Sequence, residues 1–231
     1  MKNLVKLFLI VIAIMMATDK LFAQEFGIKA GFNSSNMLVV DDSDLVDADF
    51  NMKTGFHIGV TAEFPLTEMF SLETGLLLST KGVISKDRFT DEDIGLIYEY
   101  KANLNPLYLD IPITAKASFD IGGAKIYGVF GPYVGIGLSG KIKQEMRING
   151  DTTLSEEIDI EWGSDEESSN FKRMDFGLIM GAGVELNSIQ IGLNYSLGLA
   201  NISPQTNVKV NNRVLGISVG YKFGEKKKTS Q

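Results

Sequence analysis

The sequence predicts an all-β protein: an eight-stranded antiparallel up-and-down transmembrane β-barrel, preceded by a cleaved signal peptide. Three observations predict this fold. Apolar residues recur with a period of two from Phe26 onward, the alternate positions are rich in glycine and small polar residues, and short and long connections alternate along the chain. Residues i, i+2 and i+4 of a strand share one face, so the two faces of each segment can be compared.

Residues 1–23 have the three parts of a secretory signal peptide. Lys2 and Lys6 supply the positive start, residues 7–17 form an uncharged apolar run, and the small residue Ala23 precedes Gln24. The run is shorter than the roughly 20 apolar residues that a helix needs to span about 30 Å of hydrocarbon. We therefore expect an exported protein, with a buried core helix as the alternative for this segment.

Segments with the period-two pattern are the expected strands. One face of each carries large aliphatic and aromatic side chains, and the other carries mostly Gly, Ser, Thr and Asn. Glycine-rich faces make poor solvent-exposed strand surfaces but suit a crowded lumen, while lipid accounts for the aliphatic face. The alternative is a soluble lipocalin-like barrel, whose large apolar side chains would point inward. The expected strands are 26–33, 56–64, 70–79, 107–119, 126–138, 175–186, 189–198 and 214–223.

The connections follow the rhythm of an up-and-down membrane barrel with both termini in the periplasm. Aromatic residues also stand near strand ends, as interface girdles require: Phe26, Phe64, Phe70, Phe119, Tyr221 and Phe223. The short turns are 65–69, 120–125 and 187–188, and the long loops are 37–53, 81–105, 140–173 and 200–213.

Five motifs in order carry a family resemblance: GIKAGFNSSNM at 27–37, YLDIPITAK at 108–116, GPYVGIGLSGK at 131–141, DFGLIMGAGVEL at 175–186 and RVLGISVGYKF at 213–223. They resemble the PorT-like outer-membrane β-barrel family of Bacteroidetes over essentially the whole mature chain. The resemblance implies an outer-membrane protein; one branch of that family assists type IX secretion, and most members have no assigned activity. The expected barrel is 24–223. A basic tail, 224–231, is expected in the periplasm and departs from the many such barrels that end at the last aromatic residue.

Charged residues on the inner face are expected to pair with one another. An eight-stranded barrel is just wide enough for side chains to fill, and an isolated charge buried there costs several kcal/mol. We expect a salt-bridged plug, with a selectivity or proton path as the alternative; Asp110 and Asp175 can pair with Lys81 or Arg173. The predicted lumen network is Lys29, Glu63, Glu73, Lys116, Lys125, Glu185 and Lys222.

Composition excludes several chemistries. The chain has no Cys and one His, which removes disulfides, thiolate nucleophiles and His-rich metal sites, and its formal charge of −7 argues against nucleic acid. His57 is the one candidate general base. Thr61, Glu63 and Ser79 share its inward face, but no motif fixes a nucleophile. We expect a structural histidine, no cofactor and no enzyme, with a lipid A-modifying barrel enzyme as the alternative.

Acidic residues gather in the first and third long loops. They lack EF-hand spacing, so solvated loops are the default. Alternation at 152–154 and 158–162 predicts that strands extend beyond the membrane as a hairpin, whose edge can accept a partner strand. The loop residues proposed to contact a partner or a cation are Asp41, Asp42, Asp44, Asp159, Glu161 and Trp162.

The sequence therefore predicts a non-enzymatic outer-membrane barrel with a closed lumen. Outer-membrane lipid and lipopolysaccharide are its expected surroundings. Its long external loops are expected to bind a protein partner, or the protein is expected to assist envelope biogenesis or type IX secretion. A narrow pore or transporter is the alternative.

Overall fold

The computed structural model describes residues 24–41, 44–45, 50–92 and 94–223. The predicted signal peptide and basic tail lie outside these residues. No helix among the described residues is long and apolar enough to cross a bilayer. The strands are β1 (Glu25–Asp41), β2 (Asp44–Leu45), β3 (Phe50–Asn51), β4 (Lys53–Pro65), β5 (Phe70–Thr80), β6 (Val83–Asp91), β7 (Leu96–Asp120), β8 (Lys125–Ile148), β9 (Asp151–Asp159), β10 (Met174–Leu186), β11 (Ile189–Gly198) and β12 (Val208–Phe223).

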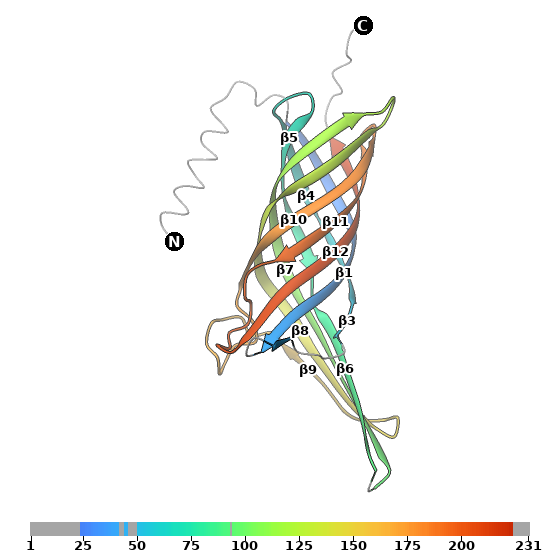
Figure 1. Ribbon diagram of the computed structural model, residues 1–231, viewed down its shortest axis with the longest axis vertical. Helices are drawn as coiled ribbons and strands as arrows, with labels where there is room; N and C mark the ends of the chain where they lie inside the picture. Colours follow the sequence, from blue (N-terminus) through green and yellow to red (C-terminus); the bar gives the residue numbers. More distant parts are fainter. Residues whose placement is uncertain (1–23, 42–43, 46–49, 93, 224–231) are drawn as a thin grey trace.

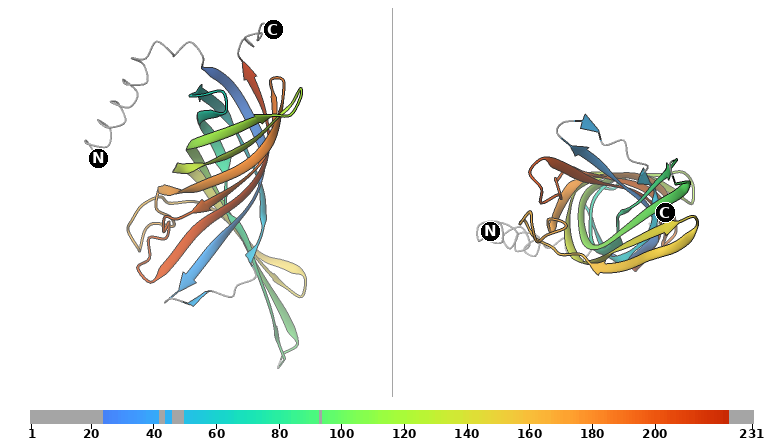
Figure 2. Two further views of the ribbon diagram at one scale, coloured as in Figure 1. Left: turned by 45° about the horizontal axis from the view of Figure 1, so that its top comes forward. Right: turned by 90° about the horizontal axis from the view of Figure 1, so that it is seen from below.

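The long strands form an antiparallel barrel (Figures 1 and 2). Each pairs with two neighbours in the order β1, β4, β5, β7, β8, β10, β11, β12, and β12 pairs in turn with β1, where Phe26 lies opposite Phe223. The predicted all-β antiparallel barrel is confirmed. Since every wall strand has a partner on both sides, the wall leaves no edge whose amide groups would lack hydrogen bonds.

Large apolar side chains cover the outside of this wall. Phe32 is 74% exposed, Ile217 is 60% exposed and Phe130 is 55% exposed. Inward positions of the same strands carry buried polar side chains such as Asn33 and Ser218. A soluble lipocalin-like barrel would bury the first set and expose the second, so this alternative does not describe the molecule. The outer surface suits hydrocarbon instead.

Short turns connect the strands at one end of the barrel. They join β4 to β5, β7 to β8 and β10 to β11, at the positions that the sequence predicts. The first residues of β1 and the last residues of β12 lie at this same end. The last of these turns places Asn187 at φ 58°, a left-handed conformation that Asn tolerates. The predicted aromatic girdle residues stand on the strands at this short-turn end.

The other end of the barrel departs from the prediction, because much of two expected loops is strand. β6, residues 96–104 of β7, residues 141–148 of β8, and β9 pair as a four-stranded antiparallel sheet. This projecting sheet extends from the long-loop end of the wall (Figure 1). For the third long loop, the sequence predicts that strands extend beyond the membrane as a hairpin, and the end of β8 and β9 form such a hairpin. β6 was not expected, because charged residues at 86–88 interrupt its apolar alternation.

Where the projecting sheet leaves the barrel, the apolar side chains change sides. Leu107 and Leu138 end the continuous row of aliphatic residues on the outer face of β7 and β8, and beyond them this face is mostly polar and charged, with Ile97 as an exception on β7. Beyond them an apolar core lies inside the mouth, beneath the connections. The change marks the level at which water replaces hydrocarbon around the chain. The core residues are Met37, Val83, Ile142, Ile160, Phe171, Ala200, Ile202 and Val210.

A lysine placed on the outer wall tests which solvent contacts it. Ile217→Lys is expected to lower the free energy of unfolding by about 2–4 kcal/mol, because it puts a charge into hydrocarbon. Leu154→Lys, at a similarly exposed apolar position of β9, is the matched control and should change it by less than about 0.5 kcal/mol. Denaturant titration of the protein folded into vesicles measures both. Equal small effects would mean that water contacts the wall.

Candidate functional site

A layer of ion pairs fills the lumen near the short-turn end. Lys116, on β7, is fully buried, with its Nζ 2.8 Å from Glu63 Oε2 and 3.4 Å from Glu185 Oε2. Lys222, on β12, lies 2.9 Å from Glu185 and 3.2 Å from Glu63. Lys29, on β1, lies 2.5 Å from Glu73 on β5. The structure thus brings together six of the predicted lumen residues from six strands, and three ammonium groups face three carboxylates.

Lys125 is the predicted network member that the structure places elsewhere. It is the first residue of β8, opposite Asp120 and Glu185 in the register, and its side chain is exposed. A strand's first residue at the barrel rim can direct a long side chain into solvent instead of the lumen. Lys125 therefore lies outside the ion-pair layer.

Three polar groups complete this layer; the alternation of the sequence already places Gln190 on the inner face at this level, whereas Glu25 and Ser71 are additions to the predicted network. Glu25 accepts a hydrogen bond from Lys222 at 2.6 Å, Ser71 donates to Glu63 at 2.6 Å, and Gln190 donates to Glu185 at 3.1 Å. Glu25 has the same parity as Lys29 on β1, so extending the alternation by one residue would have found it. Several donors to each buried carboxylate replace the hydrogen bonds that water would supply.

A second charged layer lies nearer the long-loop end. Lys81 is 1% exposed, and its Nζ lies 2.8 Å from Asp110 Oδ1 and 3.0 Å from Asp175 Oδ2. Tyr133 and Asn212 also donate to Asp175, at 3.1 Å and 3.0 Å. Of the two predicted partners of these aspartates, Lys81 is therefore confirmed. Arg173 instead donates to the carbonyl of Gly137.

Trp162, one of the loop residues proposed for partner contact, is half-buried and packs over this layer at the barrel mouth. Its ring meets Tyr108 edge-on, with centroids 5.4 Å apart at 82°, and also packs near Phe171. A Cβ on Gly137 would lie 2.3 Å from the indole, so only glycine leaves room for it. The Tyr108 ring in turn lies 4.5 Å from Lys81 Nζ. The indole gains more from this apolar stack than from solvent.

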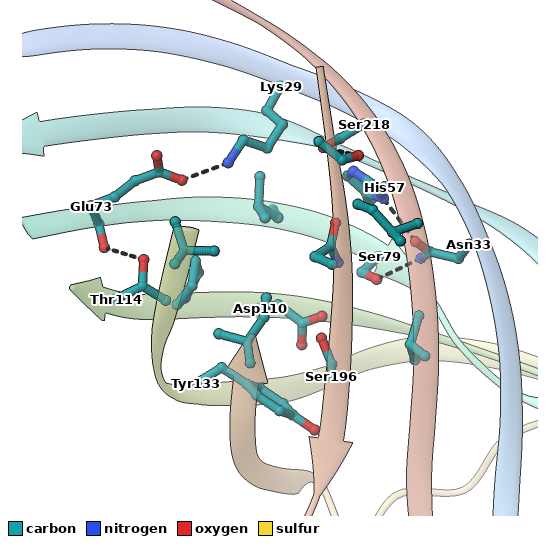
Figure 3. Close-up of a pocket in the computed structure, with 18 of the residues that line it drawn as sticks. Lys29, Asn33, His57, Glu73, Ser79, Asp110, Thr114, Tyr133, Ser196 and Ser218 are labelled. Carbon is teal, nitrogen blue, oxygen red and sulfur yellow. Dashed lines mark hydrogen bonds and ion pairs between the residues drawn. The ribbon is translucent and has the colours of Figure 1, made fainter. Parts of the chain in front are cut away.

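His57 lines a cavity of about 70 Å³ between the two layers (Figure 3). Asn33 Nδ2 donates to Ser79 Oγ at 3.0 Å and to the carbonyl of Thr80, which leaves its Oδ1 to accept from His57 Nδ1 at 2.7 Å. No carboxylate hydrogen-bonds His57 among the described residues, since Glu63 is held by Ser71, Lys116 and Lys222. The cavity has room for a few waters, and the serine–histidine–acid arrangement is not assembled.

The acidic loop candidates do not converge on one point. Asp41 ends β1 and Asp159 ends β9, both exposed, and Glu161 is exposed between β9 and the mouth. Asp44 begins β2, but its side chain and all of Asp42 lie outside the described part of the structure. Within the described ranges, no three His, Cys, Asp or Glu side chains gather to hold a metal ion.

The projecting sheet has two chemically distinct faces, which follow from its register. The face continuous with the lumen side is the apolar face, where Phe89 stacks on Tyr98 with centroids 4.7 Å apart. It carries Val83, Phe89, Leu96, Tyr98, Tyr100, Leu104, Ile142, Met146, Ile148, Leu154 and Ile158, among the acidic residues Asp87, Asp91, Asp151 and Glu156. The opposite, basic face continues the outer surface of the wall. It carries Lys86, Arg88, Lys101, Lys141, Lys143 and Arg147, among Glu99, Glu145, Glu157 and Asp159 and the apolar residues Ile84 and Ile97.

Ion pairs on the basic face are exposed and local. Lys141 donates to Glu157 across β8 and β9, and this hydrogen bond lowers the pKa of the Glu157 carboxyl. Lys143 lies 3.0 Å from Glu145 and likewise lowers its pKa. Lys141 and Lys143 keep 58% and 47% of their side-chain surface exposed. Solvent screens such pairs, so they hold these side chains weakly.

Comparison with protein families agrees with this architecture. A family model described as outer membrane protein beta-barrel domain matches residues 22–204. No protein of curated function matches the chain. Among solved structures, Ail, the attachment invasion locus protein of Yersinia pestis, is 20% identical and covers 87% of this chain and 99% of its own, with a TM-score of 0.33. Neisserial surface protein A is 14% identical, covers 86% and 97%, and has a TM-score of 0.37. An outer membrane channel from Pseudomonas putida F1 is 12% identical, covers 87% and 96%, and has a TM-score of 0.31.

Removing one partner from the ion-pair layer tests its contribution to stability. Lys116→Met is expected to lower the free energy of unfolding by about 3–5 kcal/mol, because it leaves buried carboxylates unpaired. The matched control, Lys125→Met, removes the same charge from an exposed site and should cost less than about 0.5 kcal/mol. Denaturant titration in vesicles compares the two, and equal losses would contradict the assignment.

Proposed function

This chain belongs to the outer membrane protein β-barrel domain family, and from that premise we propose that it is a closed, non-enzymatic barrel that presents its projecting sheet to a protein partner outside the cell. In this orientation the short turns and both termini lie in the periplasm, as up-and-down barrels of this kind place them. The long-loop end and the projecting sheet then face outward.

The contents of the lumen support a closed barrel over a pore. Lys116 and its carboxylates cross the lumen at one level, and Lys81, Asp110 and Asp175 cross it at another. Tyr108 and Trp162 stack above the second level. A solute would have to break buried ion pairs twice, at several kcal/mol each time.

The surroundings of His57 support a structural role. Its Nδ1 is occupied by Asn33, and that amide is itself fixed by backbone carbonyls of the two neighbouring strands. The arrangement links the adjacent wall strands β1, β4 and β5 on their inner face, between the two charged layers. A lipid A-modifying enzyme would need its nucleophile and acid at the outer surface, within reach of lipid.

The observation that carries the proposed partner binding is the apolar face of the projecting sheet. Phe89 and Tyr100 are 47% and 41% exposed there, and Leu154 is 52% exposed. These side chains lie beyond the hydrocarbon level, where exposed apolar surface of this kind is typical of protein-binding sites. Because this face is on the lumen side of the wall, a partner would sit over the barrel mouth.

The outer edge of β9 offers a second element to the same partner. All nine residues of β9 are exposed, and in the described structure it pairs with β8 alone. Its four acidic side chains and lack of Lys or Arg disfavour pairing with a second β9, but allow a basic strand to add to the sheet. The resemblance to PorT-like barrels supports a partner from envelope biogenesis or type IX secretion.

Solute flux tests the closed lumen. Vesicles that contain the purified mature protein are expected to exclude small sugars and ions as well as protein-free vesicles do, in swelling and conductance measurements. Vesicles with a general porin provide the positive control. Flux above the protein-free level would favour the pore and overturn the plug.

Loss of the apolar face tests partner binding. The triple variant Phe89→Ser/Tyr100→Ser/Leu154→Ser is expected to reproduce the phenotype of a gene deletion in assays of secreted proteins and detergent sensitivity. Barrel folding, followed by heat-modifiable migration on gels, should stay unchanged, since these side chains lie outside the wall. Wild-type behaviour of the folded variant, alongside a deletion phenotype, would exclude this face as the binding surface.

A further inference from the structure

We propose that the basic face of the projecting sheet binds the phosphate groups of lipopolysaccharide headgroups in the outer leaflet. This inference rests on the proposed outward orientation of the sheet. It is separate from the protein-binding role of the apolar face, because it concerns the opposite side of the same strands.

The distribution of charge on the sheet is the first observation. All six Lys and Arg residues of the projecting sheet lie on the basic face, and none lies on the apolar face. Four acidic residues share the basic face, so it carries a positive excess on a chain whose formal charge is −7. Lipopolysaccharide presents the complementary charge, since its headgroups carry phosphates.

The position of this face relative to the bilayer is the second observation. On β7 and β8 the basic face directly continues the outer surface of the wall, beyond Leu107 and its opposite residue Ser139. Lys143 follows Ser139 by four residues, or about 13 Å along the strand, which is about 10 Å in height at the usual tilt. Lys101 precedes Leu107 by six residues on β7. At the same rise per residue and the same tilt, it lies about 15 Å above the level of Leu107 and Ser139. The side chains of Lys143 and Lys101 are therefore directed laterally, toward the layer of lipid headgroups and core sugars.

An opposed pair of lysines is the third observation. Lys86 and Lys101 lie directly opposite each other on β6 and β7, and both side chains are exposed. Neither forms an ion pair within the described part of the structure, where Glu145, opposite Lys101, is held by Lys143 and Arg147. Like charges directly opposite in a sheet repel, and an anion between them relieves the repulsion. A phosphate group bound by both ammonium groups would serve this purpose.

The existing ion pairs do not compete strongly with such a ligand. Arg88 lies 3.7 Å from Glu99, Arg147 lies 3.7 Å from Glu145, and both arginines are about half exposed or more. Exposed pairs of this kind contribute little stability. Lys143 can therefore exchange its bond with Glu145 for a headgroup phosphate at small cost.

Binding of phosphorylated lipopolysaccharide to the full mature chain in phosphatidylcholine nanodiscs tests the proposal. Each lysine near an anionic surface contributes about 1 kcal/mol, or about fivefold in affinity. The variant Lys86→Gln/Lys101→Gln/Lys143→Gln is therefore expected to weaken binding by about a hundredfold. The charge-preserving variant Lys86→Arg/Lys101→Arg/Lys143→Arg should stay within about threefold of wild type, and heat-modifiable migration verifies that both are folded.

Three further probes define the ligand. Dephosphorylated lipopolysaccharide should bind as weakly as the glutamine variant binds the intact form, and inorganic phosphate at millimolar concentration should not compete. The Phe89→Ser/Tyr100→Ser/Leu154→Ser variant should retain lipopolysaccharide binding, so that failure of the protein-binding proposal leaves this result intact. Equal binding by wild type and glutamine variant, no dependence on the lipid's phosphates, or full competition by inorganic phosphate would each overturn the headgroup assignment.

Discussion

Charges inside the barrel must neutralise one another, because the wall around them is covered by hydrocarbon on its other side and the lumen is too narrow for bulk water. This constraint explains why Lys116, which has no exposed surface, lies between Glu63 and Glu185, and why Lys81 lies between Asp110 and Asp175. Each pair joins strands that are distant in sequence. The ion pairs therefore fix the register of the wall as well as fill it.

Beyond the membrane-spanning wall, the distribution of apolar side chains between the two faces is reversed. Beyond Leu107 and Leu138, water surrounds the strands, and the apolar residues move to the inner face, where Val83 and Ile142 join a core beneath the connections. The outer face of the sheet becomes basic beyond this level. In the orientation and with the ligands that we propose, the projecting sheet would have lipid headgroups on its basic face and a protein partner on its apolar face.

Much of the wall could be predicted because its two faces have different solvents. Period two fixed which residues point inward, so Lys29, Glu63 and Glu185 were placed in the lumen without coordinates. Lys125 was misplaced because parity assigns a face but does not say whether a rim side chain bends into water. Beyond the wall, charged and apolar residues alternate irregularly, so the sequence pattern predicts a loop where the structure has β6.

Contacts between distant loops were the least predictable part. The sequence names Trp162 as a loop residue, but its packing depends on Tyr108 and on the space above Gly137, which no local pattern reveals. The pairing of Lys81 with two aspartates was anticipated as one of two alternatives. Its supporting bonds from Tyr133 and Asn212 were not, because they depend on how four strands and the connection that carries Lys81 meet across the lumen.

Spin-label accessibility along β7 tests the central claim most directly, with the protein folded into vesicles. Labels at 109, 111 and 113 should collide freely with lipid-soluble oxygen and not with a water-soluble nickel complex. Labels at 101, 103 and 105, on the same face, should show the reverse. Access of the nickel complex to all six positions, or oxygen access at 108, 110 and 112 instead, would contradict the account.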